Sequence, residues 1–217
     1  MKKHIICLGD SNTHGYCADP ALARFNEDER WACLLQKALG EDYLVFEEGL
    51  SGRTTVFSAP LYEGLDALHY LWLCLKSHEP VSLLIIMLGT NDSKERFGMN
   101  VFAISLGMRR LVQKAQTIDC RGPGSKPNIL IVAPPVIGEG VLTSPAAGEM
   151  GTMGHGCVEK SRKLPAHYRR VAEEAGCRFL DANECGAEFN TIDFMHLTRR
   201  VHANLADALA RLVPTLL

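Results

Sequence analysis

Five short apolar runs alternate along the chain with longer stretches of helical spacing, and this alternation predicts the fold. The runs expected to form strands are residues 4–8, 43–47, 82–88, 128–133 and 178–180. Apolar side chains that recur every three or four residues predict helices over 27–39, 61–77, 101–118, 158–175 and 198–212. Because strands that alternate with helices form crossover units, we expect a mostly parallel five-stranded sheet with helices on both faces.

One segment departs from this alternation. Residues 134–156 read PPVIGEGVLTSPAAGEMGTMGHG, which is rich in glycine and proline and nearly free of charge. Ordered loops of this length usually cover a binding site or form an interface. We therefore expect a lid or a subunit contact here, within a single domain that spans residues 1–217.

The composition is that of an ordinary globular protein. Hydrophobic residues make up 47% of the chain, charged residues make up 22%, and the formal net charge is -2. This balance excludes a disordered chain and argues against a basic nucleic-acid binder. The longest apolar run, 83–88, is far shorter than the roughly 18 residues of a membrane helix, so we expect no contact with a membrane. The eight cysteines form no Cys-x-x-Cys pair and are expected as free thiols. The charged start that runs directly into a strand indicates a cytoplasmic protein.

Polar groups suited to acyl transfer follow three predicted strands and precede the last helix. The segments are GDSN, LSGRT, GTND and DFMH, at residues 9–12, 50–54, 89–92 and 193–196. In an open parallel sheet, ligands bind beyond the carboxyl ends of the strands, near the point where strand order reverses. We therefore expect these four segments to meet at one edge of the sheet.

The residue types at this edge fit a serine nucleophile with a histidine base. A serine hydroxyl needs an imidazole to remove its proton, which assigns these roles to Ser11 and His196. A carboxylate must orient the imidazole, and Asp193 lies three residues before it. The oxyanion formed during acyl transfer needs N–H donors, which the backbone of Ser11 and Gly52 and the side chain of Asn91 can supply.

Other residues compete for these roles. Asp66 and His69 repeat the Asp-x-x-His spacing, but they fall within the helix expected over 61–77, about mid-length and on a solvated face. Asp10 and Asp92 are expected to accept hydrogen bonds within their loops rather than to act as acids. A serine after a strand is, taken alone, more often a helix cap than a nucleophile. Only the four segments together indicate catalysis.

The four segments resemble the sequence blocks of the SGNH (GDSL-type) hydrolases, in the same order and over nearly the whole chain. The neighbouring text EEGLSGRTT and MLGTND is similar to bacterial arylesterase/acyltransferase members of that family. The resemblance implies a flavodoxin-like three-layer α/β/α sandwich and ester hydrolysis without a metal or other cofactor. It implies a triad of Ser11, Asp193 and His196, and an oxyanion hole formed by Ser11, Gly52 and Asn91. Because such members are often multimeric, we also expect a homo-oligomer.

The sequence departs from the family pattern around the expected site. Asn12 stands where leucine is commoner, and His14 and Tyr16 follow where the arylesterase-like members often carry tryptophan, which predicts a more polar mouth. Phe194 and Met195 replace smaller residues and predict a narrower pocket. Arg53 is expected either to contact an anionic group of the substrate or to extend into solvent. The side chains expected to contact substrate are Asn12, His14, Arg53, Phe194 and His155.

The sequence therefore predicts a serine esterase that hydrolyses short-chain aryl or alkyl carboxylic esters through an acyl-enzyme intermediate. Transfer of the acyl group to an alcohol is a second outcome open to the same intermediate. The near-neutral net charge suits a small uncharged ester. Two alternatives remain: a carbohydrate O-deacetylase with the same triad, and a non-catalytic flavodoxin-like binding domain, since a fold alone does not define a function.

Overall fold

The chain folds around one parallel sheet of five strands. The computed structural model describes residues 1–145, 153–186, 188 and 190–217. The strands are β1 (Lys3–Gly9), β2 (Tyr43–Gly49), β3 (Val81–Met87), β4 (Asn128–Ala133) and β5 (Arg178–Asp181). They lie in the order β2-β1-β3-β4-β5 with every neighbouring pair parallel, which is the order of flavodoxin-like doubly wound folds.

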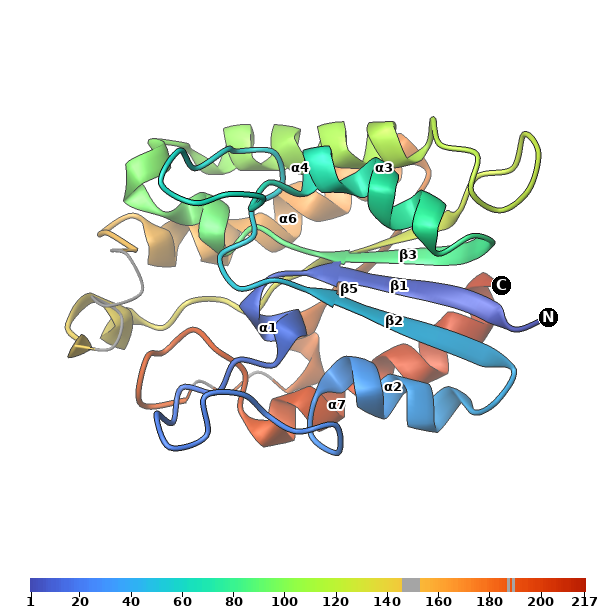
Figure 1. Ribbon diagram of the computed structural model, residues 1–217. Helices are drawn as coiled ribbons and strands as arrows, with labels where there is room; N and C mark the ends of the chain where they lie inside the picture. Colours follow the sequence, from blue (N-terminus) through green and yellow to red (C-terminus); the bar gives the residue numbers. More distant parts are fainter. Residues whose placement is uncertain (146–152, 187, 189) are drawn as a thin grey trace.

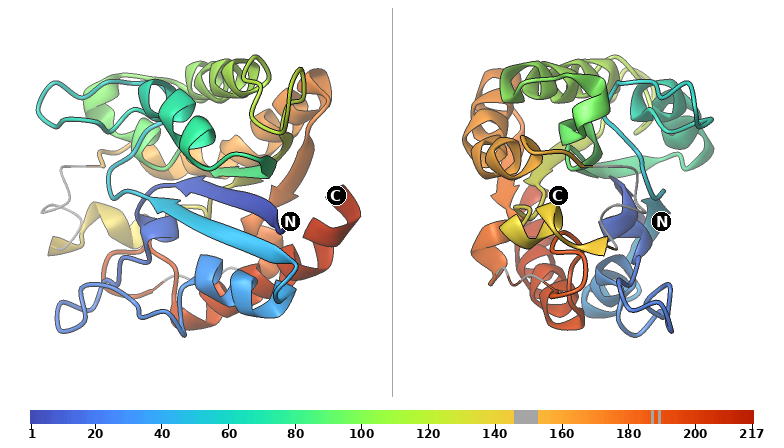
Figure 2. Two further views of the ribbon diagram at one scale, coloured as in Figure 1. Left: turned by 45° about the vertical axis from the view of Figure 1, so that its right-hand side comes forward. Right: turned by 90° about the vertical axis from the view of Figure 1, so that its left-hand side faces the viewer.

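Helices cover both faces of this sheet (Figure 1, Figure 2). One face carries α3 (Ala67–Ser77), α4 (Val101–Ala115) and α6 (Cys157–Ala175), and the other carries α2 (Trp31–Leu39) and α7 (Arg199–Leu212). A short helix, α1 (Ser11–His14), follows β1 at the carboxyl edge of the sheet, away from the two chain termini (Figure 1). The predicted three-layer α/β/α sandwich is confirmed.

The side chains of β1 alternate between two hydrophobic cores. Ile6 and Leu8 pack with α3, α4 and α6, whereas Ile5 and Cys7 pack with α2 and α7. Because successive side chains of a strand point to opposite faces, a strand covered on both sides is apolar throughout. This is why the central strands appear in the sequence as unbroken apolar runs.

Helices α2 and α3 both begin later than the sequence predicts. Gly64 has a left-handed backbone (φ 70°), and Asp66 caps α3 by accepting a hydrogen bond from the His69 backbone N–H at 3.0 Å. This cap ends the loop and overrides the apolar spacing that favoured an earlier start. Asp66 and His69 therefore lie at the first turn of α3, and the prediction of a mid-helix position is wrong.

The structure describes both ends of the predicted long loop 134–156. It contains a turn of 3-10 helix, η3 (Glu139–Leu142), and its two ends meet in a small apolar cluster where Ile137, Val141 and Met153 pack with Met195. Residues 146–152 lie outside the described part of the chain. Whether the loop is a lid or a subunit contact stays a prediction.

The helices and the cysteines of the chain bear on two further expectations. None of the helices in the described ranges has the length and apolar character needed to span a bilayer. All eight cysteines are free thiols, as predicted.

Candidate active site

Ser11, His196 and Asp193 form one chain of hydrogen bonds at the carboxyl edge of the sheet. Ser11 Oγ lies 2.8 Å from His196 Nε2, and His196 Nδ1 lies 2.7 Å from Asp193 Oδ2. With Nδ1–H donating to the carboxylate, Nε2 accepts the hydroxyl hydrogen of Ser11. The imidazole is 5% exposed and the carboxylate 0% exposed, so bulk water does not compete for either bond. The distances fit a nucleophile, its base and the group that orients the base.

The loop before α7 holds Asp193 in its charged form. Asp193 Oδ1 accepts hydrogen bonds from the Asn190 amide at 2.7 Å and from the backbone N–H groups of Met195 and His196 at 3.0 and 3.1 Å. Burial raises the pKa of Asp193, but the hydrogen bond and charge of His196, together with the Asn190 and Met195 donors, outweigh it. They hold the pKa of this carboxyl below its usual range, so it remains available to stabilise a protonated imidazole.

The start of α1 places Ser11 directly beyond the end of β1. Asp10 caps the helix, and its Oδ1 accepts a hydrogen bond from the Asn12 backbone N–H at 3.0 Å, as its predicted loop role requires. Burial raises the pKa of Asp10 to about 6, although the Asn12 N–H and the charge of His196 oppose the shift. At Gly49 a Cβ atom would lie 2.1 Å from the His14 backbone nitrogen, so glycine lets α1 pack against the end of β2.

Donors for an oxyanion come from three separate strand ends and border the same cavity as Ser11. Gly52 has φ 87°, a left-handed backbone that favours glycine. Within the part of the chain that the structure describes, the backbone N–H groups of Ser11 and Gly52 have no acceptor. The Asn91 amide donates to the Arg53 carbonyl at 3.1 Å and approaches Asp10 Oδ2 at 3.4 Å, which fixes its orientation at the cavity wall.

Comparison with known proteins assigns this arrangement to a family. The sequence matches the model of the GDSL-like Lipase/Acylhydrolase family over residues 7–206. The chain belongs to this family. The predicted relationship to the SGNH (GDSL-type) hydrolases is therefore confirmed, and with it the class of carboxylic ester hydrolases.

Solved structures of two GDSL-like esterases resemble the whole chain. Est24, a carbohydrate acetylesterase from Sinorhizobium meliloti, is 34% identical with a TM-score of 0.90, and the match covers 100% of both chains. The native aryl esterase of M. smegmatis is 35% identical with a TM-score of 0.89, and the match covers 99% of this chain and 100% of that one. No curated protein sequence matches the chain.

Asn12 of this GDSL-like hydrolase joins two segments of the chain and does not line the cavity in the structure as described. Its Oδ1 accepts the Leu197 backbone N–H at 2.9 Å, and its Nδ2 donates to the Met195 carbonyl at 3.5 Å. The side chain is buried and is not among the described residues that line the cavity. Asn12 thus ties the Ser11 helix to the loop that carries His196, and the expected substrate contact is not found.

Arg53 is also structural. Its guanidinium is buried, donates to the carbonyl groups of Gly9 (3.1 Å) and Glu48, and lies 4.9 Å from the centre of the Tyr70 ring. The arginine therefore fastens the loop after β2 to the end of β1. Its burial contradicts the expectation of a solvated side chain, and Arg53 is not among the described residues that line the cavity.

The remaining expected contacts also lie off the cavity. His14 ends α1, and burial, aided by the Arg24 charge, lowers its pKa. The Phe194 ring packs on Gly140, where a Cβ atom would lie 2.5 Å from it, and Phe194 has a left-handed backbone (φ 61°). His155 is exposed. In the structure as described, none of the three borders the cavity.

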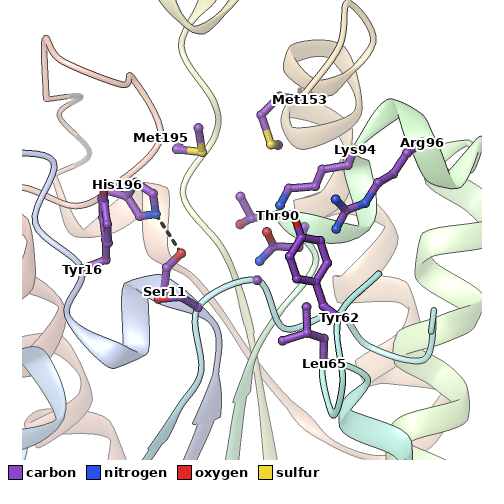
Figure 3. Close-up of a pocket in the computed structure, with 13 residues that line it drawn as sticks. Ser11, Tyr16, Tyr62, Leu65, Thr90, Lys94, Arg96, Met153, Met195 and His196 are labelled. Atoms are coloured by element: carbon purple, nitrogen blue, oxygen red, sulfur yellow. Dashed lines mark hydrogen bonds between the residues drawn. The ribbon is translucent and has the colours of Figure 1, made fainter. Parts of the chain in front are cut away.

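The cavity beside Ser11 has a volume of about 260 Å³ (Figure 3). The Tyr16 ring lies against His196, with 4.4 Å between ring centres, and Met195 lies above them. The substrate contacts expected from the sequence did not include several residues on its other walls: Tyr62, Leu65, Thr90, Lys94, Arg96 and Met153. A signal was present for four of them, because Thr90 lies in the GTND segment, Lys94 and Arg96 follow it almost directly, and Met153 lies in the loop 134–156.

Asp92 lies buried behind the cavity and holds two of its segments together through hydrogen bonds. Its carboxylate accepts hydrogen bonds from the Thr55 backbone N–H at 3.0 Å and from the Thr55 hydroxyl, which confirms the predicted role in its loop. Burial raises the pKa of Asp92 to about 6, and the Thr55 hydrogen bonds oppose the shift. Asp92 thus joins the segment after β3 to the segment after β2.

One group of described residues has side chains of the kind that bind metal ions, but these residues are not among those that line the cavity. Potential ligand atoms of Glu48, Cys74 and His78 lie within 4.8 Å of one another, on β2 and on α3 with its C-cap. Glu48 accepts a hydrogen bond from the Tyr70 hydroxyl at 2.7 Å and pairs with His78 at 3.3 Å. These contacts satisfy Glu48 within the protein.

Proposed function

We propose that this GDSL-like hydrolase cleaves short-chain carboxylic esters through an acyl-enzyme intermediate on Ser11. The observation that carries the proposal is the continuous chain from Ser11 Oγ through His196 to Asp193. The chain ends at a cavity that also borders Gly52 and Asn91, so nucleophile, base and oxyanion donors can act on one carbonyl group.

The roles of these residues follow from the geometry of the site. His196 Nε2 takes the hydroxyl proton as Ser11 Oγ bonds to the ester carbonyl carbon. The negative charge on the carbonyl oxygen is stabilised by the N–H groups of Ser11 and Gly52 and by the Asn91 amide. The imidazolium, stabilised by Asp193, returns its proton to the leaving alcohol as the ester C–O bond breaks. Water then repeats the sequence and releases the acid and free Ser11.

The size of the cavity supports a short acyl group. A cavity of about 260 Å³, bounded in part by Leu65, Met153 and Met195, suits a short acyl group better than a long chain. We expect kcat/KM to fall once the acyl chain exceeds this space.

A carbohydrate O-deacetylase is the second candidate. It is supported by the whole-chain similarity to Est24, the carbohydrate acetylesterase from Sinorhizobium meliloti. The triad chemistry is the same and only the leaving alcohol differs. Acetate release from acetylated sugars and from phenyl acetate separates the two candidates. Addition of an alcohol to the same assay measures acyl transfer, and light scattering measures the predicted homo-oligomer.

The mechanism is tested by turnover of short aryl and alkyl esters in the wild type and in Ser11→Ala. We expect the variant to lose activity by a factor on the order of 10⁴ or more. Ser58→Ala is a matched control, because Ser58 donates to Asp66 at 3.0 Å in the other Asp-x-x-His turn. Full turnover by Ser11→Ala would overturn the mechanism. A folded wild type without any turnover would favour the non-catalytic binding domain.

A further inference from the structure

Two cations lie on one wall of the cavity, opposite the catalytic imidazole. Lys94 and Arg96 belong to the segment after η1 (Asn91–Ser93), and both line the cavity. Figure 3 shows their side chains extending toward the centre, across from His196. Lys94 is only 6% exposed, whereas Arg96 is at the exposed rim. The wall beyond the reacting serine is therefore positively charged.

Neither cation is neutralised by a partner within the described residues. The ion pairs and side-chain hydrogen bonds found there include neither Lys94 nor Arg96. Arg96 instead lies over the rings of Tyr62 and Phe97, at 5.3 and 5.0 Å from their centres. Among the described residues that line the cavity, none carries a carboxylate. Because lysine is almost never fully buried unless it is paired, this arrangement favours an anion in the cavity.

A third group on the same wall also lacks a partner. Thr90 is 4% exposed, its hydroxyl is buried without a hydrogen-bond partner, and it borders the cavity. In Figure 3 it lies between Ser11 and Lys94. A buried hydroxyl without a partner costs free energy unless a ligand meets it. The hydroxyl oxygen is itself covered, so Thr90 borders the cavity through the rest of its side chain and leaves the charged contact to Lys94.

The protonation state of Lys94 fits this role. Burial lowers the pKa of Lys94 to about 8, the charge of Arg96 adds to the shift, and the charge of Asp10 opposes it. The ammonium form therefore predominates at pH 7. A buried ammonium with a guanidinium at the rim suits the terminal carboxylate of a short chain.

We propose that the cavity selects acyl groups that end in a carboxylate, which Lys94 binds and Arg96 attracts. The substrates are then half-esters of short dicarboxylic acids. The acyl side is assigned because the leaving oxygen must face His196, and the acyl chain diverges from it toward the opposite wall. This inference rests on the proposed function. It also changes the expectation of an uncharged ester, which came from the net charge of the whole chain rather than from the charge of the cavity.

The test compares monoethyl esters of succinic, glutaric and adipic acid with ethyl esters of the same acids in which the far carboxyl is a primary amide. The amide has nearly the same shape and no charge, and ethanol release is measured for both. We expect the wild type to prefer the acid over the amide in kcat/KM for at least one chain length. Lys94→Met should lower this acid-to-amide ratio by about tenfold or more, as for loss of a charge-assisted hydrogen bond. Arg96→Gln should lower it less.

Two controls keep the result specific. Lys94→Arg retains the charge and should retain a preference for the acid. Lys126→Met removes an exposed lysine outside the cavity and should leave the ratio unchanged. If Lys94→Met does not fold, the wild-type ratio and the Arg96→Gln ratio still decide the matter.

Several outcomes would overturn the inference. They are a wild-type preference for the amide at every chain length, or a ratio that Lys94→Met does not change. A preference found only on the alcohol side, for 4-acetoxybenzoate over 4-acetoxybenzamide, would overturn the acyl-side assignment. In each case Ser11-dependent hydrolysis of the neutral esters would leave the proposed function intact. Hydrolysis that persists in Ser11→Ala would instead refute the proposed function.

Discussion

Two Asp-x-x-His turns in this chain have nearly the same internal geometry and different surroundings. In each, the carboxylate accepts the histidine backbone N–H, at 3.0 Å for Asp66 and 3.1 Å for Asp193. In each, it also bonds to histidine Nδ1, at 2.6 and 2.7 Å. The His69 side chain, however, is 80% exposed, whereas that of His196 is 5% exposed and meets Ser11 through Nε2.

The difference shows what the local sequence can and cannot encode. Four residues suffice to pair a carboxylate with an imidazole, because the Asp side chain caps the turn that carries the histidine. A serine on the far nitrogen of the imidazole, oxyanion donors and a cavity come only from segments distant in the chain. Asn12 supplies one such link between Ser11 and the loop of His196. Catalysis therefore belongs to the tertiary arrangement and not to the turn.

The largest expected effect on kcat comes from replacing the histidine of each turn by alanine. His196→Ala removes the base, and we expect kcat for short esters to fall by a factor on the order of 10⁴ to 10⁶. His69→Ala removes an exposed imidazole and should leave kcat within about twofold, since surface substitutions rarely matter. Equal losses in the two variants would show that the buried turn has no special role.

Replacement of the two aspartates sharpens the comparison further. Asp193→Asn keeps the shape of the side chain but no longer stabilises the protonated imidazole, and kcat should fall by roughly 10³ to 10⁴. Asp66→Asn keeps a good helix cap and should change neither kcat nor, by more than a few tenths of a kcal/mol, the free energy of unfolding. Steady-state kinetics and urea unfolding measure both. A kcat of Asp193→Asn close to that of the wild type would contradict the account.

Asn12 tests whether the link between segments positions the imidazole. In Asn12→Ala the hydrogen bond to the Leu197 N–H is lost, and we expect kcat to fall by about tenfold to a hundredfold with KM little changed, as for a group that orients catalytic residues. The split between kcat and KM is the decisive readout. A raised KM with unchanged kcat would instead support the direct contact with substrate that the sequence predicted for Asn12.

The smallest expected effect is on the free energy of unfolding and its dependence on pH. It arises from Asp92, which is buried beneath the site. Because the pKa of Asp92 is raised to about 6 in the fold, the native state binds a proton more readily than the unfolded chain. The stability that this group contributes is therefore fully present below its ordinary pKa and is lost as pH rises through about 6. Asp92→Asn removes this dependence.

Urea unfolding between pH 4 and pH 7 measures the difference. The free energy of unfolding of the wild type, relative to Asp92→Asn, should grow by about 1–3 kcal/mol as pH falls across this range. Ser58→Ala in the other Asp-x-x-His turn provides the control, since it removes no titratable group and should show no such trend. A gap between wild type and Asp92→Asn that stays constant with pH would contradict the burial-raised pKa.

The fold could be predicted from the sequence because its signals are local. Apart from Ser82 and Asn128 at their starts, the runs 82–88 and 128–133 are apolar, which marks strands covered on both faces, and β3 and β4 lie there. The four polar segments could be placed together because parallel strands end at one edge. The start of α3 was missed because the cap at Asp66 outweighs apolar spacing.

The substrate-contacting residues could not be predicted because orientation is set by contacts from afar. Arg53 stands beside Gly52 in the sequence, yet carbonyl groups of β1 and β2 draw its guanidinium away from the cavity. Phe194 precedes the lining residue Met195, and its left-handed backbone turns its ring onto Gly140. Lys94 is the converse case, because its neighbours in the chain do not show that it is buried without a partner.

The central claim is that Ser11 is the nucleophile, and covalent labelling tests it most directly. The wild type, Ser11→Ala and Ser58→Ala are treated with a fluorophosphonate, and intact mass and peptide mapping locate the adduct. We predict one adduct on Ser11 in the wild type and in Ser58→Ala, with none in Ser11→Ala, because only Ser11 is hydrogen-bonded to a buried His–Asp pair. An active wild type that remains unlabelled, or an adduct on another serine, would contradict the claim.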